Sequence, residues 1–264
     1  MKLGIIQMHS NDDKKHNRAR AEALVGVCAA QGATLACLPE NFSWLGPDAG
    51  KPAAAEPVPG PTTVWLGDLA RRLRIWLHGG SILEQAPGGR SYNTTAFFAP
   101  DGTLTATYRK IHLFDADIED KTYRESDQVV PGTEVVTAAA GDLRVGLSIC
   151  YDIRFPELFR TMSAAGVDIF FIPSAFTVPT GNAHWHSLVR ARAIENQAFV
   201  AAPAQVGTDP AGKSYFGHSL VVDPWGAIIA ELAGPTEGNA VADCDPERIA
   251  EVRMRLPALK HRKL

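Results

Sequence analysis

The feature that most constrains the fold is a series of short strand-like runs, some of which are apolar at nearly every position. Residues 169–172 form the clearest of them, with four apolar side chains in succession. Such runs are typical of β-strands covered on both faces, because a strand with one face in water alternates apolar and polar residues. The predicted strands are Leu3–Met8, Thr34–Leu38, Ile75–Leu83, Thr94–Ala99, Leu143–Ile149, Asp168–Ile172, Ala198–Ala204 and Ser219–Val222.

Helical patterns lie between several of these strands. Leu24, Val27 and Cys28 fall on one face of a predicted helix that Asn11 or Asp12 is expected to cap. Two more helices are predicted, one from the spacing of Trp65, Leu69, Leu73 and Trp76 and one over His184–Gln197. Strands and helices that alternate along one chain indicate a layered α/β fold.

Two loop signals complete the organisation. The residues 93–99 and 103–108 flank Asp101 and Gly102, and this pattern predicts a β-hairpin. The stretch from Gly46 to Pro61 is rich in proline and glycine. It is too short, and too closely followed by patterned sequence, to join two domains, so we expect a surface excursion. Residues 1–264 are therefore predicted to form a single domain.

Charge and composition exclude several classes of function. The chain has 26 Lys and Arg against 29 Asp and Glu, which gives a formal net charge of −3 and no broad positive field for nucleic acid or a membrane surface. No segment approaches the roughly 18–20 apolar residues that span a bilayer, and the first ten residues favour a strand over a signal peptide. The four cysteines are widely spaced, without the pattern of a metal site or a disulfide framework. We expect a cytoplasmic protein without a metal.

Three segments carry a polar or reactive residue where a predicted strand ends: residues 35–40, 108–114 and 146–152. Strand ends are where reacting groups gather in layered α/β folds. Taken singly, Cys150 is read as a buried inert thiol, Glu40 as a loop carboxylate and Lys110 as a solvated lysine. Together they supply a nucleophile, a base for its proton and a cation for the developing oxyanion, without a histidine.

These segments resemble a known family. CLPENF at 37–42, YRKIHLFD at 108–115 and ICYDIRFPELFR at 149–160 are similar to the three signature segments of the nitrilase, or carbon–nitrogen hydrolase, superfamily. The resemblance implies a four-layer α-β-β-α sandwich whose subunits pair into a homodimer or a larger homo-oligomer. It also implies a Glu–Lys–Cys triad that works without an organic or metal cofactor.

The resemblance assigns roles residue by residue. Glu40 matches the general base, which we expect to be shielded from solvent, Lys110 the oxyanion lysine and Cys150 the nucleophile. The backbone N–H of Tyr151 is expected to be a second oxyanion donor. A further glutamate of the family orients the lysine or the substrate nitrogen. Glu125, six positions before Pro131, fits this place, and Glu119 is the nearby alternative.

The segments at 123–132, 173–207 and 215–226 resemble amidases that act on deaminated glutathione and, nearly as much, ω-amidases that act on 2-oxoglutaramate. The motif FGHSLVVDPWG favours the former. Both substrates are small amides with a 2-oxoglutaramyl group, so a cation is expected near the pocket. The candidate pocket residues are Arg154, Phe176, Thr180 and His184, and all of them except Thr180 also have a structural alternative.

Two other functions remain open at this point. The triad serves nitriles as well as amides, so a nitrilase that acts on a small nitrile is one alternative. A catalytically silent interaction protein on the same fold is the other. The joint presence of Glu40, Lys110 and Cys150 argues against the silent protein, since binding alone does not require all three.

Overall fold

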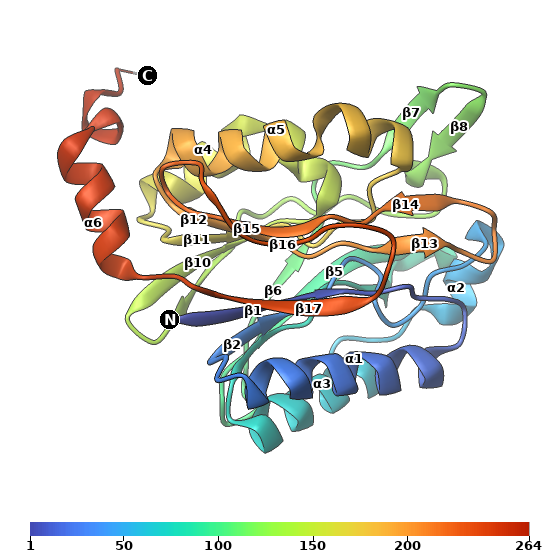
Figure 1. Cartoon of the computed structure of the whole chain (residues 1–264). Helices are drawn as coiled ribbons and strands as arrows, with labels where there is room; N and C mark the ends of the chain where they lie inside the picture. Colours follow the sequence, from blue (N-terminus) through green and yellow to red (C-terminus); the bar gives the residue numbers. More distant parts are fainter. Residues whose placement is uncertain (264) are drawn as a thin grey trace.

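The computed structural model describes residues 1–263, which form two β-sheets packed face to face with helices on both outer faces (Figure 1). The first sheet has the order β17-β1-β2-β3-β5-β4, and β6 pairs with β5. Its strands are β1 (Lys2–Gln7), β2 (Leu35–Cys37), β3 (Trp76–His78), β4 (Ile82–Gln85), β5 (Ser91–Phe98), β6 (Leu104–Arg109) and β17 (Gly238–Asp243).

The second sheet has the order β16-β15-β12-β11-β10-β9. Its strands are β9 (Thr137–Ala140), β10 (Leu143–Leu147), β11 (Ile169–Phe171), β12 (Phe199–Ala202), β15 (Ser219–Val222) and β16 (Ile228–Leu232). Two small antiparallel hairpins stand apart from the large sheets: β7 (Asp115–Ile118) with β8 (Lys121–Arg124), and β13 (Val206–Thr208) with β14 (Ser214–Phe216).

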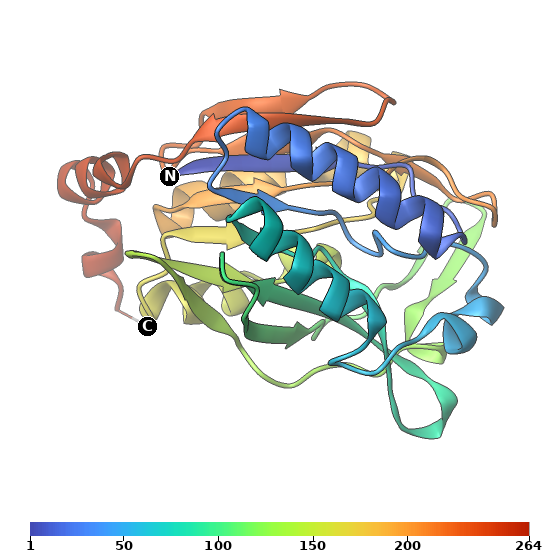
Figure 2. The same ribbon diagram turned by 90° about the horizontal axis from the view of Figure 1, so that it is seen from below.

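Helices cover the outer face of each sheet. Helices α1 (Lys14–Ala30) and α3 (Pro61–Leu73) lie side by side across the first sheet (Figure 2). Helices α4 (Pro156–Ala164) and α5 (Val178–Asn196) cover the second sheet, while α2 (Lys51–Ala54) is a single turn and α6 (Pro246–Arg255) follows β17. The predicted four-layer α-β-β-α sandwich is therefore confirmed. No helix within residues 1–263 is long and apolar enough to cross a membrane.

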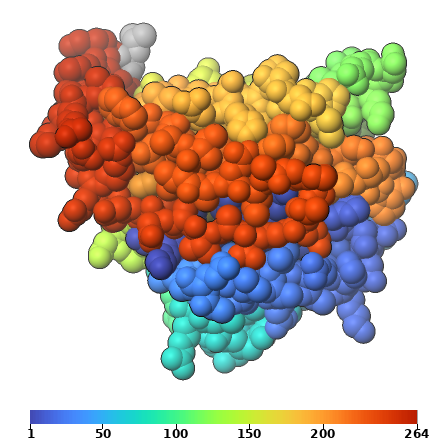
Figure 3. Space-filling model, in the orientation of Figure 1, coloured from blue at the N-terminus to red at the C-terminus, as the bar shows by residue number. Residues whose placement is uncertain are grey.

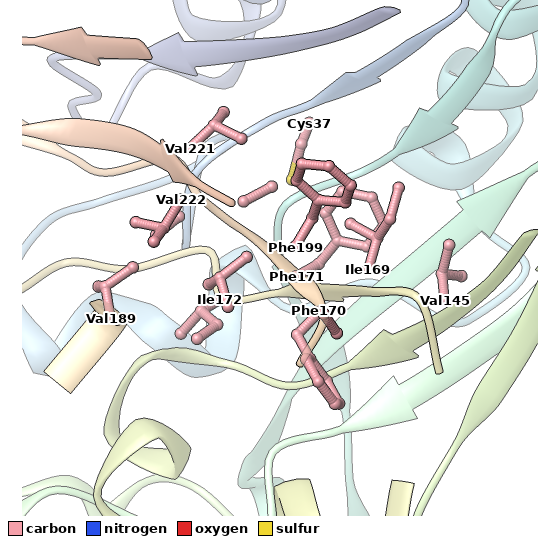
Figure 4. Packing of buried hydrophobic residues seen from close by; sticks show 14 of the residues in the cluster. Cys37, Val145, Ile169, Phe170, Phe171, Ile172, Val189, Phe199, Val221 and Val222 are labelled. Atoms are coloured by element: carbon pink, nitrogen blue, oxygen red, sulfur yellow. The ribbon is translucent and has the colours of Figure 1, made fainter. Parts of the chain in front are cut away.

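The apolar run of β11 explains how the layers pack. All four side chains of residues 169–172 are fully buried, as the pattern predicts for a strand covered on both faces. Phe171 points toward the first sheet, whereas Phe170 points the other way (Figure 4). The ring of Phe171 is 6.2 Å from that of Phe97 in the first sheet, and the ring of Phe170 is 5.4 Å from that of Phe159 in α4. One strand thus holds the inner and the outer layer together.

Some predicted boundaries are wrong. The side chain that caps α1 is Asp13, which accepts hydrogen bonds from the amides of residues 15 and 16, not Asn11 or Asp12. Trp76 lies in β3 and not on the preceding helix, because Arg74 adopts a left-handed conformation with φ of 55° and ends α3. The helix expected from His184 begins six residues earlier, at Val178. The predicted strand over residues 75–83 is two strands, β3 and β4.

The predicted hairpin is confirmed as β5 and β6. Asp101 accepts a hydrogen bond from the amide of Thr103, and Gly102 has φ of 90°, which glycine adopts without strain. The excursion at 46–61 contains α2 and packs its Ala54 and Ala55 against the body of the protein.

Gly80 fixes the backbone that leads to Glu40. It has φ of 58°, and a Cβ atom built on it would lie 2.1 Å from the carbonyl oxygen of Pro39. The Gly80 carbonyl accepts a hydrogen bond from Thr95 of β5. Only a residue without a side chain allows the two chain segments to approach this closely.

We therefore expect Gly80→Ala to lower the free energy of unfolding by about 2 kcal/mol or more, because the new methyl group meets backbone that cannot move aside. Chemical denaturation measures this change. The matched control is Gly26→Ala in α1, where a Cβ meets no atom within 4 Å. Alanine favours the helix there, so the control should gain about 0.5–1 kcal/mol. Equal effects at both positions would contradict the packing argument.

Candidate active site

The three motif residues come together at the ends of three strands. Glu40 follows β2 and Lys110 follows β6, both in the first sheet, while Cys150 follows β10 of the second sheet. β6 runs in the same direction as β2, because two antiparallel pairings and one parallel pairing separate them. The carboxyl ends of the two strands therefore share one edge, and the facing sheet brings Cys150 to it.

Glu40 is buried and held at both oxygen atoms. Its side chain is 4% exposed, so it is shielded from solvent as expected. One oxygen accepts hydrogen bonds from Asn93 Nδ2 at 2.8 Å and Lys110 Nζ at 3.1 Å, and the other accepts the backbone N–H of Ala175 at 2.8 Å. Three donors from different segments thus fix the direction in which the carboxylate points.

Lys110 is the centre of the charge cluster. Its side chain is 2% exposed, and Nζ donates to Glu40 at 3.1 Å and to the two oxygens of Glu125 at 2.8 and 3.0 Å. Burial opposes the charge of Lys110, but the carboxylates of Glu125 and Glu40 outweigh it and hold the pKa of the ammonium well above its ordinary value. The lysine is therefore a permanent buried cation.

Glu125 is the second glutamate that contacts Lys110. It also accepts the backbone N–H of Phe114 at 2.7 Å. Burial raises its pKa, but the charge and hydrogen bonds of Lys110 dominate and leave the pKa below the ordinary value of a glutamate. Glu119 is exposed in the turn between β7 and β8 and makes no contact with the cluster. The structure thus places Glu125, and not Glu119, against the lysine.

Cys150 begins a short 3₁₀ turn, Cys150–Arg154, with φ of 48°. Such a φ is rare outside glycine and asparagine, and it holds the side chain at a sharp corner of the chain. Burial, followed by the charge of Glu40, raises the pKa of the thiol well above its ordinary value, and Lys110 opposes this only in part. The resting cysteine is therefore a thiol and not a thiolate. The thiol needs a base.

Asp152 fixes this corner and is a residue that the motif reasoning did not single out. It is fully buried and accepts hydrogen bonds from the hydroxyl of Tyr108 at 2.7 Å and the amide of Ile149 at 2.8 Å. It also contacts the amide and the ring of His112, at 3.0 and 2.8 Å. Because Tyr108 and His112 flank Lys110 in the sequence, Asp152 ties the lysine segment to the cysteine segment. The only sequence signal was its position two residues after the cysteine.

A pocket opens above Cys150, Lys110 and Glu40. Its walls come from residues 45–51, the β7–β8 hairpin, the β13–β14 hairpin and the start of α5. Tyr151 lines it, and its N–H belongs to the first amides of a helical turn, which have no partner within that turn. On the far wall, Tyr215 donates a hydrogen bond to Asp209 at 2.7 Å. The proline- and glycine-rich stretch thus forms part of the pocket mouth.

The predicted substrate residues divide into two groups. Arg154, Phe176 and Thr180 line the pocket, and the Arg154 guanidinium lies 5.4 Å from the ring of Phe176. His184 is exposed and lies outside the pocket lining, where its Nδ1 is 3.4 Å from Arg154. Its position on the outer side of α5 separates it from the cavity, so the structure does not bring His184 to the site.

Arg154 differs from the other cations of the pocket wall. Lys51 and Lys213 both pair with Asp48, and Arg124 pairs with Asp117. Among residues 1–263, no carboxylate forms an ion pair with Arg154. Its positive charge is available to an anionic group in the pocket.

The charges of Glu40, Lys110 and Glu125 are already balanced in part without a metal ion. Lys110 already lies between the two carboxylates and neutralises one of their charges. Within residues 1–263, the group of side chains with the spacing of metal ligands lies elsewhere, at His186, His218 and Glu231. The cluster can instead supply a base, a fixed cation and a thiol to one substrate atom.

Comparison with known proteins agrees with the resemblance of the motifs. The sequence matches the carbon–nitrogen hydrolase family over residues 2–254. It is 41% identical over 262 residues to a deaminated glutathione amidase of Synechocystis sp., covering 97% of this chain and 96% of that protein. It is also 41% identical over 265 residues to the omega-amidase NIT2 of Homo sapiens, covering 99% and 95% of the two chains.

Solved structures share the fold. The Saccharomyces cerevisiae protein Nit3, described as a member of branch 10 of the nitrilase superfamily, superimposes with a TM-score of 0.90 and 34% identity, covering 100% of this chain and 97% of that chain. The C. elegans NitFhit protein has a TM-score of 0.91 and 34% identity, covering 99% of this chain and 65% of that chain. The chain therefore belongs to the carbon–nitrogen hydrolase family.

Proposed function

We propose that this carbon–nitrogen hydrolase is a cofactor-independent amidase that cleaves a small linear amide through a thioester on Cys150. The observation that carries the proposal is the buried cluster of Lys110 between Glu40 and Glu125, at the floor of the pocket that holds Cys150. A buried cation with two carboxylates costs stability unless its charges are used or fully paired. A silent binding protein has no need for this arrangement beside a thiol.

In the first step, Glu40 takes the proton of the Cys150 thiol as the sulfur attacks the amide carbon. The C–S bond forms, and the carbonyl electrons move to oxygen as an oxyanion. Lys110 Nζ and the backbone N–H of Tyr151 hold this oxyanion. Such donors typically contribute ~3–4 kcal/mol each to lowering the barrier. The raised pKa of Cys150 keeps the resting thiol protonated, so the proton transfer to Glu40 is part of the reaction.

In the second step, protonated Glu40 donates its proton to the leaving nitrogen as the C–N bond breaks, and the amine departs. Glu40, again ionised, removes a proton from water, which attacks the thioester. The C–S bond then breaks, and the thiol is restored with the proton from Glu40. Glu125 takes no proton: with its two oxygens on Lys110 and a bond from Phe114, it positions the lysine.

For the substrate, we propose deaminated glutathione, which would be hydrolysed to 2-oxoglutarate and Cys-Gly as metabolite repair. Arg154 would bind a carboxylate of the 2-oxoglutaramyl group, since it is the pocket cation without an acidic partner within residues 1–263. The Synechocystis relative named for this substrate supports the choice. The segment at 215–226, which favoured it, contributes only Tyr215 to the pocket wall, so the choice rests more on the relative.

The second candidate is ω-amidase activity on 2-oxoglutaramate. It is supported by the human relative, an omega-amidase with the same 41% identity. Both substrates carry the same acyl group and differ in the leaving amine, so they would use the same triad and Arg154. Nitrile hydrolysis stays a third and weaker candidate, because both relatives are amidases.

We also propose that the chain works in the cytoplasm as a homodimer or a larger homo-oligomer. Ile194, Trp225 and Ile228 are 46%, 55% and 39% exposed, and a side chain on Gly226 would touch Ile194, so exposed apolar residues gather where the turn at 225–228 meets α5. Apolar areas of this kind mark protein–protein contacts. The four cysteines are free thiols, which suits a reducing compartment.

Cys150→Ala should lower kcat/KM for the amide substrate by at least about 10⁴-fold without changing the melting temperature by more than a few degrees, because the nucleophile is lost and the packing is not. The matched control is Cys244→Ala. Cys244 is also buried, with a pKa raised to about 12 by its surroundings, and lies outside the pocket. It should retain nearly full activity. Turnover by the Cys150→Ala protein would contradict the assignment of Cys150 as the nucleophile.

Arg154→Ala should lower kcat/KM for deaminated glutathione and 2-oxoglutaramate by about 10- to 100-fold, mainly through KM, because a charged hydrogen bond to the carboxylate is lost. Activity on an amide without a carboxylate should change little. The control is Arg71→Ala, which removes an exposed arginine paired with Asp68 on α3.

The same assays decide the substrate. For the unmodified enzyme, kcat/KM for deaminated glutathione should exceed that for 2-oxoglutaramate, glutamine and a simple nitrile by tenfold or more. A preference for 2-oxoglutaramate would support the ω-amidase instead. An equal loss on all amides in Arg154→Ala would show that the arginine acts only on the shape of the pocket.

A further inference from the structure

Three metal-ligand side chains meet on the surface where α5 adjoins β16, outside the pocket. His186 lies on α5, His218 just precedes β15, and Glu231 lies on β16. One Glu231 oxygen is 2.8 Å from His186 Nε2 and 2.9 Å from His218 Nδ1, and the ligand atoms all lie within 4.8 Å of one another. Figure 3 shows this face, where the gold helix α5 borders the orange-red segment of β16.

We propose that His186, His218 and Glu231 bind one divalent ion of the zinc type. Two imidazoles and one carboxylate are a ligand set that suits Zn²⁺ and its neighbours Co²⁺ and Ni²⁺, whereas Mg²⁺ and Ca²⁺ prefer oxygen ligands alone. Three protein ligands leave one position of a tetrahedral ion for water. Water can reach it, because the three side chains are 36%, 26% and 26% exposed.

The distances suit an ion after a small adjustment. With metal–ligand bonds of ~2.0–2.1 Å in a tetrahedron, neighbouring ligand atoms lie about 3.3 Å apart. Each N···O distance therefore opens by roughly half an ångström from the present hydrogen bonds.

The two rings are held in place before any ion arrives. His218 has φ of 54°, its ring stacks on Phe216 at 4.4 Å, and its carbonyl accepts the indole N–H of Trp185 at 2.8 Å. The ring of His186 stands edge-on to Phe216 at 6.1 Å and to His218 at 5.3 Å. Ligands fixed by packing lose little conformational entropy on binding. This support distinguishes the group from histidines that meet a carboxylate by chance.

The ion would join three segments that are distant in the sequence. Helix α5 also carries Thr180, and the segment before His218 also carries Tyr215, and both of these residues line the pocket. An ion that binds only the folded chain stabilises it by RT ln(1 + [ion]/Kd), so the gain in stability rises with the concentration of free ion. The inference concerns stability and stands independently of the amide substrate.

The test uses protein without a histidine tag, treated with chelator and then dialysed. It carries Cys150→Ala, so that the pocket thiol does not compete for the ion. Titration calorimetry with ZnCl₂ should give one ion per chain with a dissociation constant in the micromolar range or tighter, and the melting temperature should rise with Zn²⁺. Co²⁺ should give the visible absorption of a nitrogen and oxygen site, without a sulfur-to-cobalt charge-transfer band.

His186→Ala, His218→Ala and Glu231→Gln, each in the same background, should bind Zn²⁺ at least tenfold more weakly. The control is His16→Ala, which removes an exposed histidine on α1. Glu231→Gln keeps the size of the side chain, so it tests the ligand even if a histidine variant folds poorly. No Zn²⁺ binding in the background protein, equal binding in Glu231→Gln, or equal affinity for Mg²⁺ would overturn the proposal.

Discussion

The buried ammonium of Lys110 is the constraint on which the rest of the site depends. An ion at 2% exposure is tolerated only when partners replace its water, and Glu40 and Glu125 provide them at 2.8–3.1 Å. Each carboxylate must in turn be held, and the amides of Ala175 and Phe114 do this. The segments that supply these groups belong to both sheets, so the ion cluster forms only when the two sheets pack against each other. The same fixed cation is then ready to stabilise an oxyanion without rearrangement.

Much of the fold could be predicted, because the central strands carry an unambiguous signal. Residues 169–172 are apolar throughout, and the structure buries them between two layers. The edge strand β17 escaped prediction because its sequence is mixed and its position depends on pairing with β1, in which Lys2 lies opposite Asp243, 241 residues later in the chain. Trp76 was assigned to a helix because its spacing fits one, yet Arg74 ends that helix. Local periodicity does not reveal which distant strands pair or at which residue a helix ends.

The site was predictable to the extent that its residues form recognisable motifs. Glu40, Lys110 and Cys150 were named from three short segments, and the structure brings them together. Asn93 and Asp152 were missed, because their importance lies in what they hold: Asn93 bonds Glu40, and Asp152 ties the cysteine corner to the lysine strand. Helix α5 shows the opposite case. It places Thr180 in the pocket wall and His184 on the outer side. Which residue faces the pocket depends on how the helix is rotated about its axis, and the composition of the helix does not reveal this rotation.

The central claim is that all amide substrates with the same acyl group form the same thioester on Cys150. Hydroxylamine competes with water for such an intermediate and yields a hydroxamate. The direct measurement is the ratio of hydroxamate to 2-oxoglutarate formed from deaminated glutathione and from 2-oxoglutaramate at one hydroxylamine concentration. The account predicts the same ratio for both, because the leaving amine has departed before the ratio is decided. Different ratios, or turnover without hydroxamate, would mean that water attacks the amide directly and would contradict it.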